Sequence, residues 1–379
     1  MLILFITAST SGQPPRGPLI MSPQYNADKT ITFRYRAPHA KDVKLSAQFL
    51  KAQMPMIKDT SGTWSITVGP VKPDIYPYSF NVDGVTVMDP ANVAYFPNER
   101  FKGSLADIPD GPGDDDSALI HSVQDVPHGT VTYEYYPSME GSTGSVVIYT
   151  PPGYDKDVSK KYPVFYLISG TTDTEETFFK VGRTNLILDN LIATGKAKPM
   201  IIVMPYGNPM ARIAEQTGKP KPSDIINRDS EDAIKRAKLF ETDLVTKLIP
   251  YVEKNYRSIN DRRSRAIGGF SRGGGQTLRT AFNNMDKFSW ICCYSAYIST
   301  PEMESSYKNI YEKPEKTNKD LDLFWISVGD EDFLYKGAVD FMEFLKTKKI
   351  NYKSLITSGG HTWMNVKKYV TATAQILFQ

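Results

Sequence analysis

The chain contains little cysteine. Of its 379 residues only Cys292 and Cys293 are cysteine, and they stand side by side in the apolar run FSWICCYSA. A disulfide between neighbouring residues would strain the backbone, so we predict two buried free thiols instead of a bridge. Cysteine and histidine at zinc-binding spacing are also missing from the sequence, which argues against a structural metal site.

Charge of one sign and long apolar runs are equally scarce. The 45 basic and 42 acidic residues leave a formal charge of +3, and no run of Lys and Arg is long enough to follow a phosphate backbone, so we expect no nucleic-acid partner. No stretch approaches the roughly 20 apolar residues of a membrane-spanning helix. The opening MLILFITASTSG has a short apolar stretch but no basic start. It predicts a signal remnant or a disordered terminus over residues 1–21, and a secreted or periplasmic protein.

The pattern of apolar residues changes once along the chain. Over residues 22–106, segments such as TITFRYRAP and GTWSITVGP alternate apolar and polar side chains between Gly, Pro and Asp, which predicts a small β-sandwich. Residues 107–117, which begin DIPDGPGDDD, have the Pro, Gly and acidic content that is typical of a linker. Over residues 118–379, continuous apolar runs such as VFYLIS and MIIVMP alternate with helical stretches. This alternation predicts a mostly parallel sheet wrapped by helices, the α/β class.

One motif in this second part has a chemical mechanism. The segment GFSRG, residues 269–273, lies between the apolar run RAIGGF and the helical stretch GGGQTLRTAF. A serine on a sharp turn from strand to helix needs small residues two positions before and after it, because a side chain there would collide with the doubled-back chain. The bare pattern also occurs in ordinary glycine-rich loops. Its position between a buried strand and a helix is what favours a nucleophilic serine over such a loop. We therefore predict that Ser271 is a nucleophile and that the Arg272 N–H faces the developing oxyanion.

Histidine is scarce enough for chain order to identify the general base. The four histidines are His39, His121, His128 and His361. In α/β-hydrolases the base follows the nucleophile and the acid along the chain, and only His361 follows Ser271. It lies in SGGHTW, in a loop after the last predicted strand. We predict that His361 is the base that takes the serine proton.

The acid that orients this histidine is left open by the residues alone. Asp330, Glu331 and Asp332 all follow the apolar run LFWISVG. Asp330 comes directly after Gly329 and could be needed for the turn, whereas Asp332 has more reach, so spacing favours Asp332 only slightly. The other two are expected to be solvated turn residues, as most loop carboxylates are.

These blocks resemble carbohydrate esterase family 1, the group that contains feruloyl esterases and acetylxylan esterases. The similar blocks are PVFYLISG, DRRSRAIGGFSRGGGQT, VGDEDFLY and GGHTW. In that family the acid occurs as Gly-x-x-Asp, which is residues 329–332 in this chain, so the resemblance selects Asp332. The upstream segments ITFRYRAPHAKDVKL and GTWSITVGP resemble the immunoglobulin-like early-set domain, akin to carbohydrate-binding family 48, that often precedes the esterase domain.

Two positions depart from the family pattern. Where the family commonly has His-Gly-Gly after the first buried strand, this chain has Ser169-Gly170-Thr171-Thr172. Because the oxyanion donor there is a backbone N–H, Thr171 or Thr172 can still supply it. The residue after the nucleophile is usually Met and is Arg272 in this chain. Its guanidinium either attracts an acidic substituent or extends to solvent, and we expect solvent.

The resemblance implies a serine esterase on plant-wall xylan that releases ferulate or acetate through an acyl-enzyme, without a metal or an organic cofactor. Phe178, Phe179 and Trp363 could stack on a hydroxycinnamate, although aromatic residues beside loops more often lie in the core. A siderophore esterase shares this two-part layout and is the second hypothesis. A carbohydrate-binding protein whose hydrolase domain has lost activity is the third.

Overall fold

The structure, a computed structural model, describes residues 19–109, 119–218 and 231–379. Two compact units divide the chain between them. The N-terminal unit is the chain up to Tyr95 together with Gly103–Ile108, and the C-terminal unit is Phe96–Lys102 together with Pro109–Gln379. Most of the predicted signal remnant and of the predicted linker lies outside the described residues. The short segment Phe96–Lys102 therefore belongs to the C-terminal unit, although the predicted boundary would place it in the sandwich.

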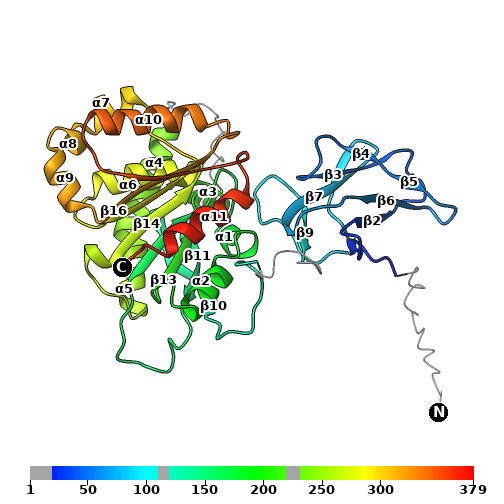
Figure 1. Cartoon of the computed structure of the whole chain (residues 1–379), viewed down its shortest axis with the longest axis horizontal. Helices are drawn as coiled ribbons and strands as arrows, with labels where there is room; N and C mark the ends of the chain where they lie inside the picture. Colours follow the sequence, from blue (N-terminus) through cyan, green and yellow to red (C-terminus); the bar gives the residue numbers. More distant parts are fainter. Residues whose placement is uncertain (1–18, 110–118, 219–230) are drawn as a thin grey trace, which may run out of the picture. The chain divides into compact units, whose positions relative to one another are not determined.

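Two antiparallel sheets build the N-terminal unit (Figure 1). One has the strand order β1-β2-β6-β5, and the other has the order β4-β3-β7-β8 with β9 also paired to β7. The strands run β1 Gln24–Tyr25, β2 Ile31–Arg36, β3 Val43–Ala47, β4 Met54–Pro55, β5 Ile57–Lys58, β6 Thr63–Val68, β7 Asp74–Val82, β8 Val85–Val87 and β9 Ser104–Ile108.

Side chains from both sheets meet in one core. Val43, Leu45 and Ala47 of β3 are buried and the residues between them are partly exposed, which is the period of two of a half-buried strand. The rings of Phe33 on β2 and Tyr78 on β7 lie 4.8 Å apart, centroid to centroid. The antiparallel all-β region is thus present, and its immunoglobulin-like assignment stays a prediction.

The C-terminal unit is organised around one eight-stranded sheet with the order β10-β11-β13-β12-β14-β15-β16-β17. The pairs β10–β11 and β11–β13 are antiparallel, and the pairs from β13 to β17 are parallel. Every residue of the central strands is buried, as expected where helices cover both faces. The strands run β10 Thr130–Pro137, β11 Thr143–Thr150, β12 Val164–Ile168, β13 Ile201–Pro205, β14 Arg265–Phe270, β15 Trp290–Tyr294, β16 Leu323–Gly329 and β17 Lys353–Thr357.

Helices connect the parallel strands. They run α1 Thr177–Lys180, α2 Thr184–Ala193, α3 Pro209–Thr217, α4 Glu231–Asp243, α5 Ile249–Asn255, α6 Arg272–Asn283, α7 Thr300–Ser306, α8 Lys308–Tyr311, α9 Pro314–Asp320, α10 Tyr335–Thr347 and α11 Trp363–Ala374. A π-helical turn, Leu244–Leu248, joins α4 to α5, and short 3₁₀ turns lie at Met139–Gly141 and Arg262–Ser264. The predicted α/β class is confirmed by this mostly parallel, helix-covered sheet.

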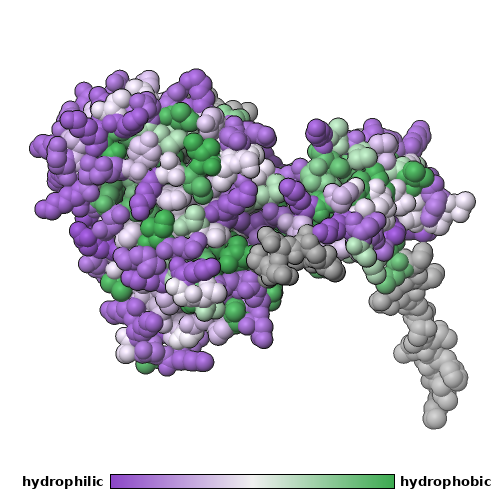
Figure 2. All heavy atoms as spheres, viewed as in Figure 1, coloured by the Kyte–Doolittle hydropathy of each residue, from purple (hydrophilic) through white to green (hydrophobic). Residues whose placement is uncertain are grey.

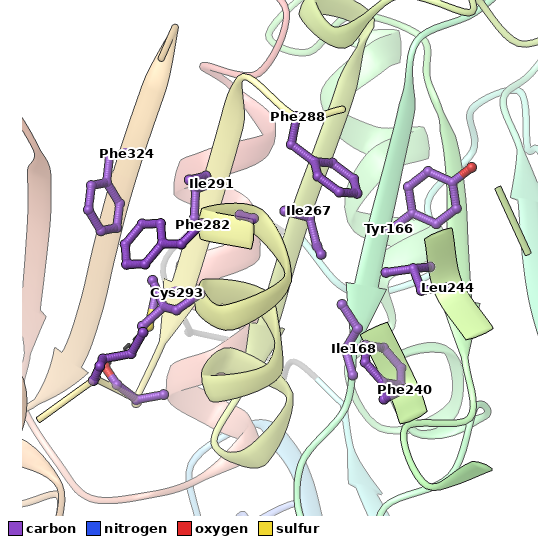
Figure 3. Close-up of a cluster of buried hydrophobic side chains, with 14 of the residues drawn as sticks. Tyr166, Ile168, Phe240, Leu244, Ile267, Phe282, Phe288, Ile291, Cys293 and Phe324 are labelled. Carbon is purple, nitrogen blue, oxygen red and sulfur yellow. Dashed lines mark hydrogen bonds between the residues drawn. The ribbon is translucent and has the colours of Figure 1, made fainter. Parts of the chain in front are cut away.

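A hydrophobic core lies between the sheet and the helices α4 and α6 (Figure 3). Side chains from β12, β14, β15 and β16 point toward Phe240, Leu244 and Phe282 (Figure 3). Cys293 belongs to this core, and the adjacent Cys292 must face the other side of the sheet because successive strand residues alternate. Both cysteines are free and fully buried, so the prediction of free thiols is confirmed.

The surface of the C-terminal unit is largely polar in the view of Figure 2, where apolar side chains stand in small groups between hydrophilic ones. Within residues 19–109, 119–218 and 231–379, no helix has both the length and the apolar character needed to cross a membrane.

Candidate active site

Ser271 occupies the sharp turn between β14 and α6. Its backbone has φ 56° and ψ −118°, a strained conformation for a residue with a side chain. A Cβ atom at Gly269 would lie 2.5 Å from the backbone of Gly273, and a Cβ at Gly273 would lie 2.1 Å from the carbonyl oxygen of Ile168. These distances explain why both flanking positions are glycine. They also show that the chain has the turn that lifts a serine hydroxyl clear of a sheet.

His361 and Asp332 are in direct contact. The His361 Nδ1 lies 2.7 Å from the Asp332 Oδ2, and the other carboxylate oxygen accepts a hydrogen bond of 2.8 Å from the Leu334 amide. Burial raises the pKa of Asp332, but these hydrogen bonds outweigh it and hold the pKa below its ordinary value. An ionised Asp332 therefore keeps the imidazole proton on Nδ1, which leaves Nε2 able to accept a proton.

The two neighbouring acids, Asp330 and Glu331, bond to the loop before His361. Asp330 Oδ1 accepts a hydrogen bond of 2.9 Å from the Gly359 amide, and the Glu331 amide donates to the Gly359 carbonyl at 3.2 Å. Both side chains are exposed. These bonds shape the loop that leads to His361. Of the three acids that spacing left open, the structure thus brings Asp332 to the imidazole.

The His361 ring lies between two phenylalanines. Its centroid is 4.5 Å from that of Phe270 and 4.6 Å from that of Phe333. Phe270 directly precedes Ser271, so this stacking places the imidazole beside the turn that holds the serine. Phe333 is 74% exposed and presents an apolar ring at the same place. Phe333 is not among the residues predicted from the sequence, although an aromatic residue directly after three acids is a signal that could have indicated it.

Phe178 and Trp363 are not surface aromatics. They are 1% and 5% exposed, and their rings pack edge to face with centroids 4.9 Å apart. Trp363 also contacts Phe270 at 5.5 Å. Because buried rings offer no face to a ligand, we correct the prediction that these two stack on a hydroxycinnamate. Phe178 packs on Trp363, and Trp363 packs on Phe270. A substrate role for the partly exposed Phe179 stays a prediction.

The turn after β12 contains the other predicted oxyanion donors. A Cβ at Gly170 would lie 3.5 Å from the Cβ of Ser271, so this turn passes directly beside the serine. Among the described residues, the amides of Thr171 and Thr172 have no hydrogen-bond acceptor. The Arg272 amide opens α6 and so has no acceptor within its helix. These amides are all candidates to bind an oxyanion formed at Ser271.

The Arg272 guanidinium does not extend to solvent, which contradicts the prediction. Its Nε and Nη2 atoms are buried and have no hydrogen-bond partner among the residues that the structure describes. Burial lowers the pKa of Arg272, whereas Glu99, Tyr206 and Asp173 oppose that shift. Glu99, which opposes the lowering of this pKa, comes from a segment far away in the sequence, so the residues around Arg272 do not indicate it.

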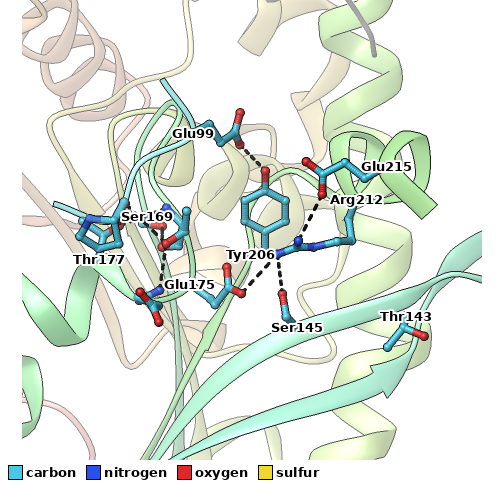
Figure 4. Close-up of polar contacts among 12 residues, drawn as sticks. Glu99, Thr143, Ser145, Ser169, Glu175, Thr177, Tyr206, Arg212 and Glu215 are labelled. Atoms are coloured by element: carbon cyan, nitrogen blue, oxygen red, sulfur yellow. Dashed lines mark hydrogen bonds and ion pairs between the residues drawn. The ribbon is translucent and has the colours of Figure 1, made fainter. Parts of the chain in front are cut away.

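A row of polar side chains that begins with Glu99 lies at the end of β13 (Figure 4). The Tyr206 hydroxyl donates a short hydrogen bond to Glu99. The Arg212 guanidinium lies over the Tyr206 ring at 4.8 Å and bonds to Ser145, Glu175 and Glu215. The bond from Tyr206 thus holds the Glu99 carboxylate at the end of β13.

Asp173, in the turn after β12, is buried, and burial raises its pKa to about 7 despite hydrogen bonds from Asn98 and Gly170. The folded chain therefore keeps a proton that the unfolded chain releases near pH 4, so this group lowers the free energy of unfolding as pH rises from about 4 to about 7. We expect Asp173→Asn to remove that part of the dependence. Urea unfolding of both proteins from pH 4 to 8 tests this. A difference in the free energy of unfolding that is the same at every pH in this range would contradict it.

The chain's family is given by its match to known proteins. A family model described as Putative esterase matches residues 137–365, more than half of the chain. The chain belongs to this esterase family. In the described ranges, no group of three His, Cys, Asp or Glu side chains could hold a metal ion.

Relatives of this esterase include a curated protein of Xylanibacter ruminicola named endo-1,4-beta-xylanase/feruloyl esterase. It is 28% identical over 364 residues, which are 94% of this chain and 46% of the relative, so the chain spans about half of its length. The CE1 ferulic acid esterase from Anaeromyces mucronatus, solved with ferulic acid, matches with a TM-score of 0.56 and 22% identity, over 68% of this chain and 94% of that one.

The enterobactin esterase from Shigella flexneri matches with a TM-score of 0.61 and 14% identity, over 92% of this chain and 93% of that one. At such identities the solved structures show the fold alone. The predicted resemblance to the feruloyl esterase group is confirmed, and so is the fold class.

Proposed function

We propose that this esterase is a serine carboxylic-ester hydrolase of plant-wall polysaccharide, with feruloylated xylan as its first substrate class and acetylated xylan as its second. The observation that carries the proposal is the contact between the buried Asp332 and His361, beside the strained turn of Ser271. The name of the Xylanibacter ruminicola relative, endo-1,4-beta-xylanase/feruloyl esterase, supports the substrate class. A secreted or periplasmic location would fit such a substrate and stays a prediction.

The positions of these groups support an acyl-enzyme mechanism. The Ser271 hydroxyl attacks the ester carbonyl while His361 Nε2 takes its proton, and Asp332 holds the imidazolium through Nδ1. The amides of Arg272 and of Thr171 or Thr172 bind the oxyanion. His361 then protonates the ester oxygen of the sugar as its bond to the acyl carbon breaks, so that the sugar departs as a free alcohol and an acyl-enzyme remains. A water molecule, deprotonated by His361, attacks the acyl group and releases the acid.

An exposed aromatic ring beside the base favours an aromatic acyl group over acetate. Phe333 lies against His361 and is largely exposed, so its ring can stack on a hydroxycinnamoyl group at the point where the ester bond is cleaved. An acetyl group is too small to use that surface. The deciding experiment measures ferulate and acetate release from feruloylated and acetylated xylo-oligosaccharides by chromatography. We expect faster release of ferulate, and release of acetate alone would reverse the order of the two substrate classes.

Replacing Phe333 by alanine should lower kcat/KM for a methyl hydroxycinnamate by about tenfold, since the lost stacking and apolar contact are worth on the order of 1 to 2 kcal/mol. The same change should leave an acetyl ester within about twofold. Tyr135→Ala is a matched control, because Tyr135 is 72% exposed on β10, at the opposite edge of the sheet from β17. Equal losses on both esters would show that Phe333 supports the loop without contacting the acyl group.

The enterobactin esterase matches both units of the chain, so a siderophore ester remains the second candidate. An anionic catecholate would be expected to use an accessible cation near the serine. The buried Nε and Nη2 atoms of Arg272 do not offer one, which favours the polysaccharide ester. Hydrolysis of enterobactin at a higher kcat/KM than any feruloyl ester would establish the siderophore candidate instead.

A further inference from the structure

The segment Phe96–Lys102 is separated by more than sixty residues from the turn after β12, yet three of its residues in a row bond to that turn and to the start of α1. The Pro97 carbonyl accepts a hydrogen bond of 2.8 Å from the Thr177 hydroxyl. The Glu99 amide donates one of 2.7 Å to the Thr172 carbonyl. We call residues 97–99 the strap.

Asn98, the middle residue of the strap, links it to the interior of the turn. Its Nδ2 donates to Asp173 Oδ1 at 3.0 Å, and the other oxygen of Asp173 accepts from the Gly170 amide at 3.2 Å. The Asn98 side-chain oxygen accepts from the Arg100 and Phe101 amides, both at 2.9 Å, which fixes the orientation of its amide group. A continuous chain of hydrogen bonds thus runs from Asn98 through Asp173 to Gly170.

The turn needs such support. Thr172 has φ 63°, in the left-handed region that costs a residue with a side chain about 1 kcal/mol or more. The Asp173 carboxylate accepts a hydrogen bond from the Gly170 amide, and the Glu99 amide donates one to the Thr172 carbonyl, so the backbone before and at Thr172 is fixed. Without these bonds the turn can relax to a lower-energy conformation, which would move the amides of Thr171 and Thr172 relative to Ser271.

We propose that Asn98 is a positioning residue that fixes the oxyanion-binding turn through Asp173. This inference rests on the proposed esterase activity and adds to it a part of the site that comes from outside the continuous hydrolase sequence. Asn98 does not touch the reacting atoms. It acts through Asp173 on the backbone amides that bind the developing charge, so its loss should weaken the transition state more than the bound substrate.

An exchange of the two side chains tests this inference. Asn98→Asp alone places two carboxylates face to face, and Asp173→Asn alone places two amides face to face. In the double variant, the amide at position 173 can donate to the carboxylate at position 98 and its oxygen can accept from Gly170. At pH 8 and on the same ester, we expect each single variant to lower kcat by at least about tenfold with KM within about twofold. The double variant should recover kcat to within about threefold of the wild type.

Asn318→Asp is the matched control. Asn318, in α9, also joins two segments, since it donates to the Lys349 carbonyl and accepts from the Asn351 amide, both at 2.8 Å. This change should leave kcat unaltered. The melting temperatures of all variants are also measured, because a lower kcat at an unchanged melting temperature shows a local effect on the turn and not a loss of overall stability. If Asn98→Asp does not fold, Asn98→Ala is measured instead and should show the same split between kcat and KM.

Two results would overturn the inference: single variants with wild-type kcat, or losses in which KM and kcat change together and the double variant recovers neither. A wild-type chain without turnover on any ester would instead contradict the proposed function. In that case the rate at which a fluorophosphonate labels Ser271 still tests the strap, because the phosphoryl oxygen binds the same amides. Equal labelling rates in the wild type and the Asn98 variants would then overturn the inference.

Discussion

Changing Ser271 to alanine should lower kcat/KM by about four orders of magnitude or more, because the variant has no atom that can form the acyl-enzyme. The melting temperature should hardly change. Alanine and serine carry the same backbone strain at φ 56°, and only one oxygen atom is removed. The measurements are ferulate release, thermal unfolding and labelling by a fluorophosphonate, which the variant should not accept.

Ser258→Ala provides the control for this experiment, because the buried Ser258 hydroxyl has no hydrogen-bond partner in the described part of the chain. It should keep both activity and labelling. If Ser271→Ala retained more than about a tenth of wild-type activity, Ser271 could not be the nucleophile. A wild-type chain that neither turns over esters nor accepts the phosphonate would support the third hypothesis, a carbohydrate-binding protein that has lost hydrolase activity.

Asp332→Asn is expected to lower kcat by up to about 10⁴-fold, because an asparagine at this position no longer holds the His361 proton on Nδ1. Asp330→Asn and Glu331→Gln should stay within about tenfold of the wild type. Both side chains are exposed, and an asparagine oxygen at position 330 can still accept from the Gly359 amide. Steady-state rates on one feruloyl ester compare all three changes.

The three acid variants also serve as controls for one another, since each removes one negative charge from the same turn. A loss shared by all of them would mean that the charge of the turn matters and that no single acid orients the histidine. A loss confined to Asp330→Asn would mean that the family pattern Gly-x-x-Asp has been aligned two residues away from its true position.

The turn at Ser271 could be predicted because its cause is local. A Cβ at Gly269 or Gly273 would clash with residues within a few positions of the serine or with one neighbouring strand. The two glycines of the motif therefore indicate the turn without knowledge of distant segments. The position of His361 beside this turn could be predicted because chain order left one histidine after the serine. Asp332 could not be separated from its neighbours by spacing, since three adjacent acids look alike until the loop around Gly359 folds and engages two of them.

The errors have a common physical origin in contacts between distant segments. The sequence shows that Phe178, Trp363 and Phe333 are aromatic, but only the packing of α1 against α11 shows which rings are buried. Arg272 was expected in solvent because most arginines are exposed. Its actual surroundings include Glu99, which stands more than 170 positions earlier and was predicted to belong to another domain.

The course of the chain between the two units has an evolutionary consequence. The backbone enters the C-terminal unit at Phe96, returns to the N-terminal unit at Gly103 and leaves it again after Ile108. No single cut in the gene therefore separates the two units completely. A recombination event that replaced the N-terminal unit up to Ile108 would also replace Asn98 and its neighbours, and with them the contacts to the turn beside the serine. The coding regions for the two units are thus expected to be inherited together, with changes in the strap compensated by changes at position 173.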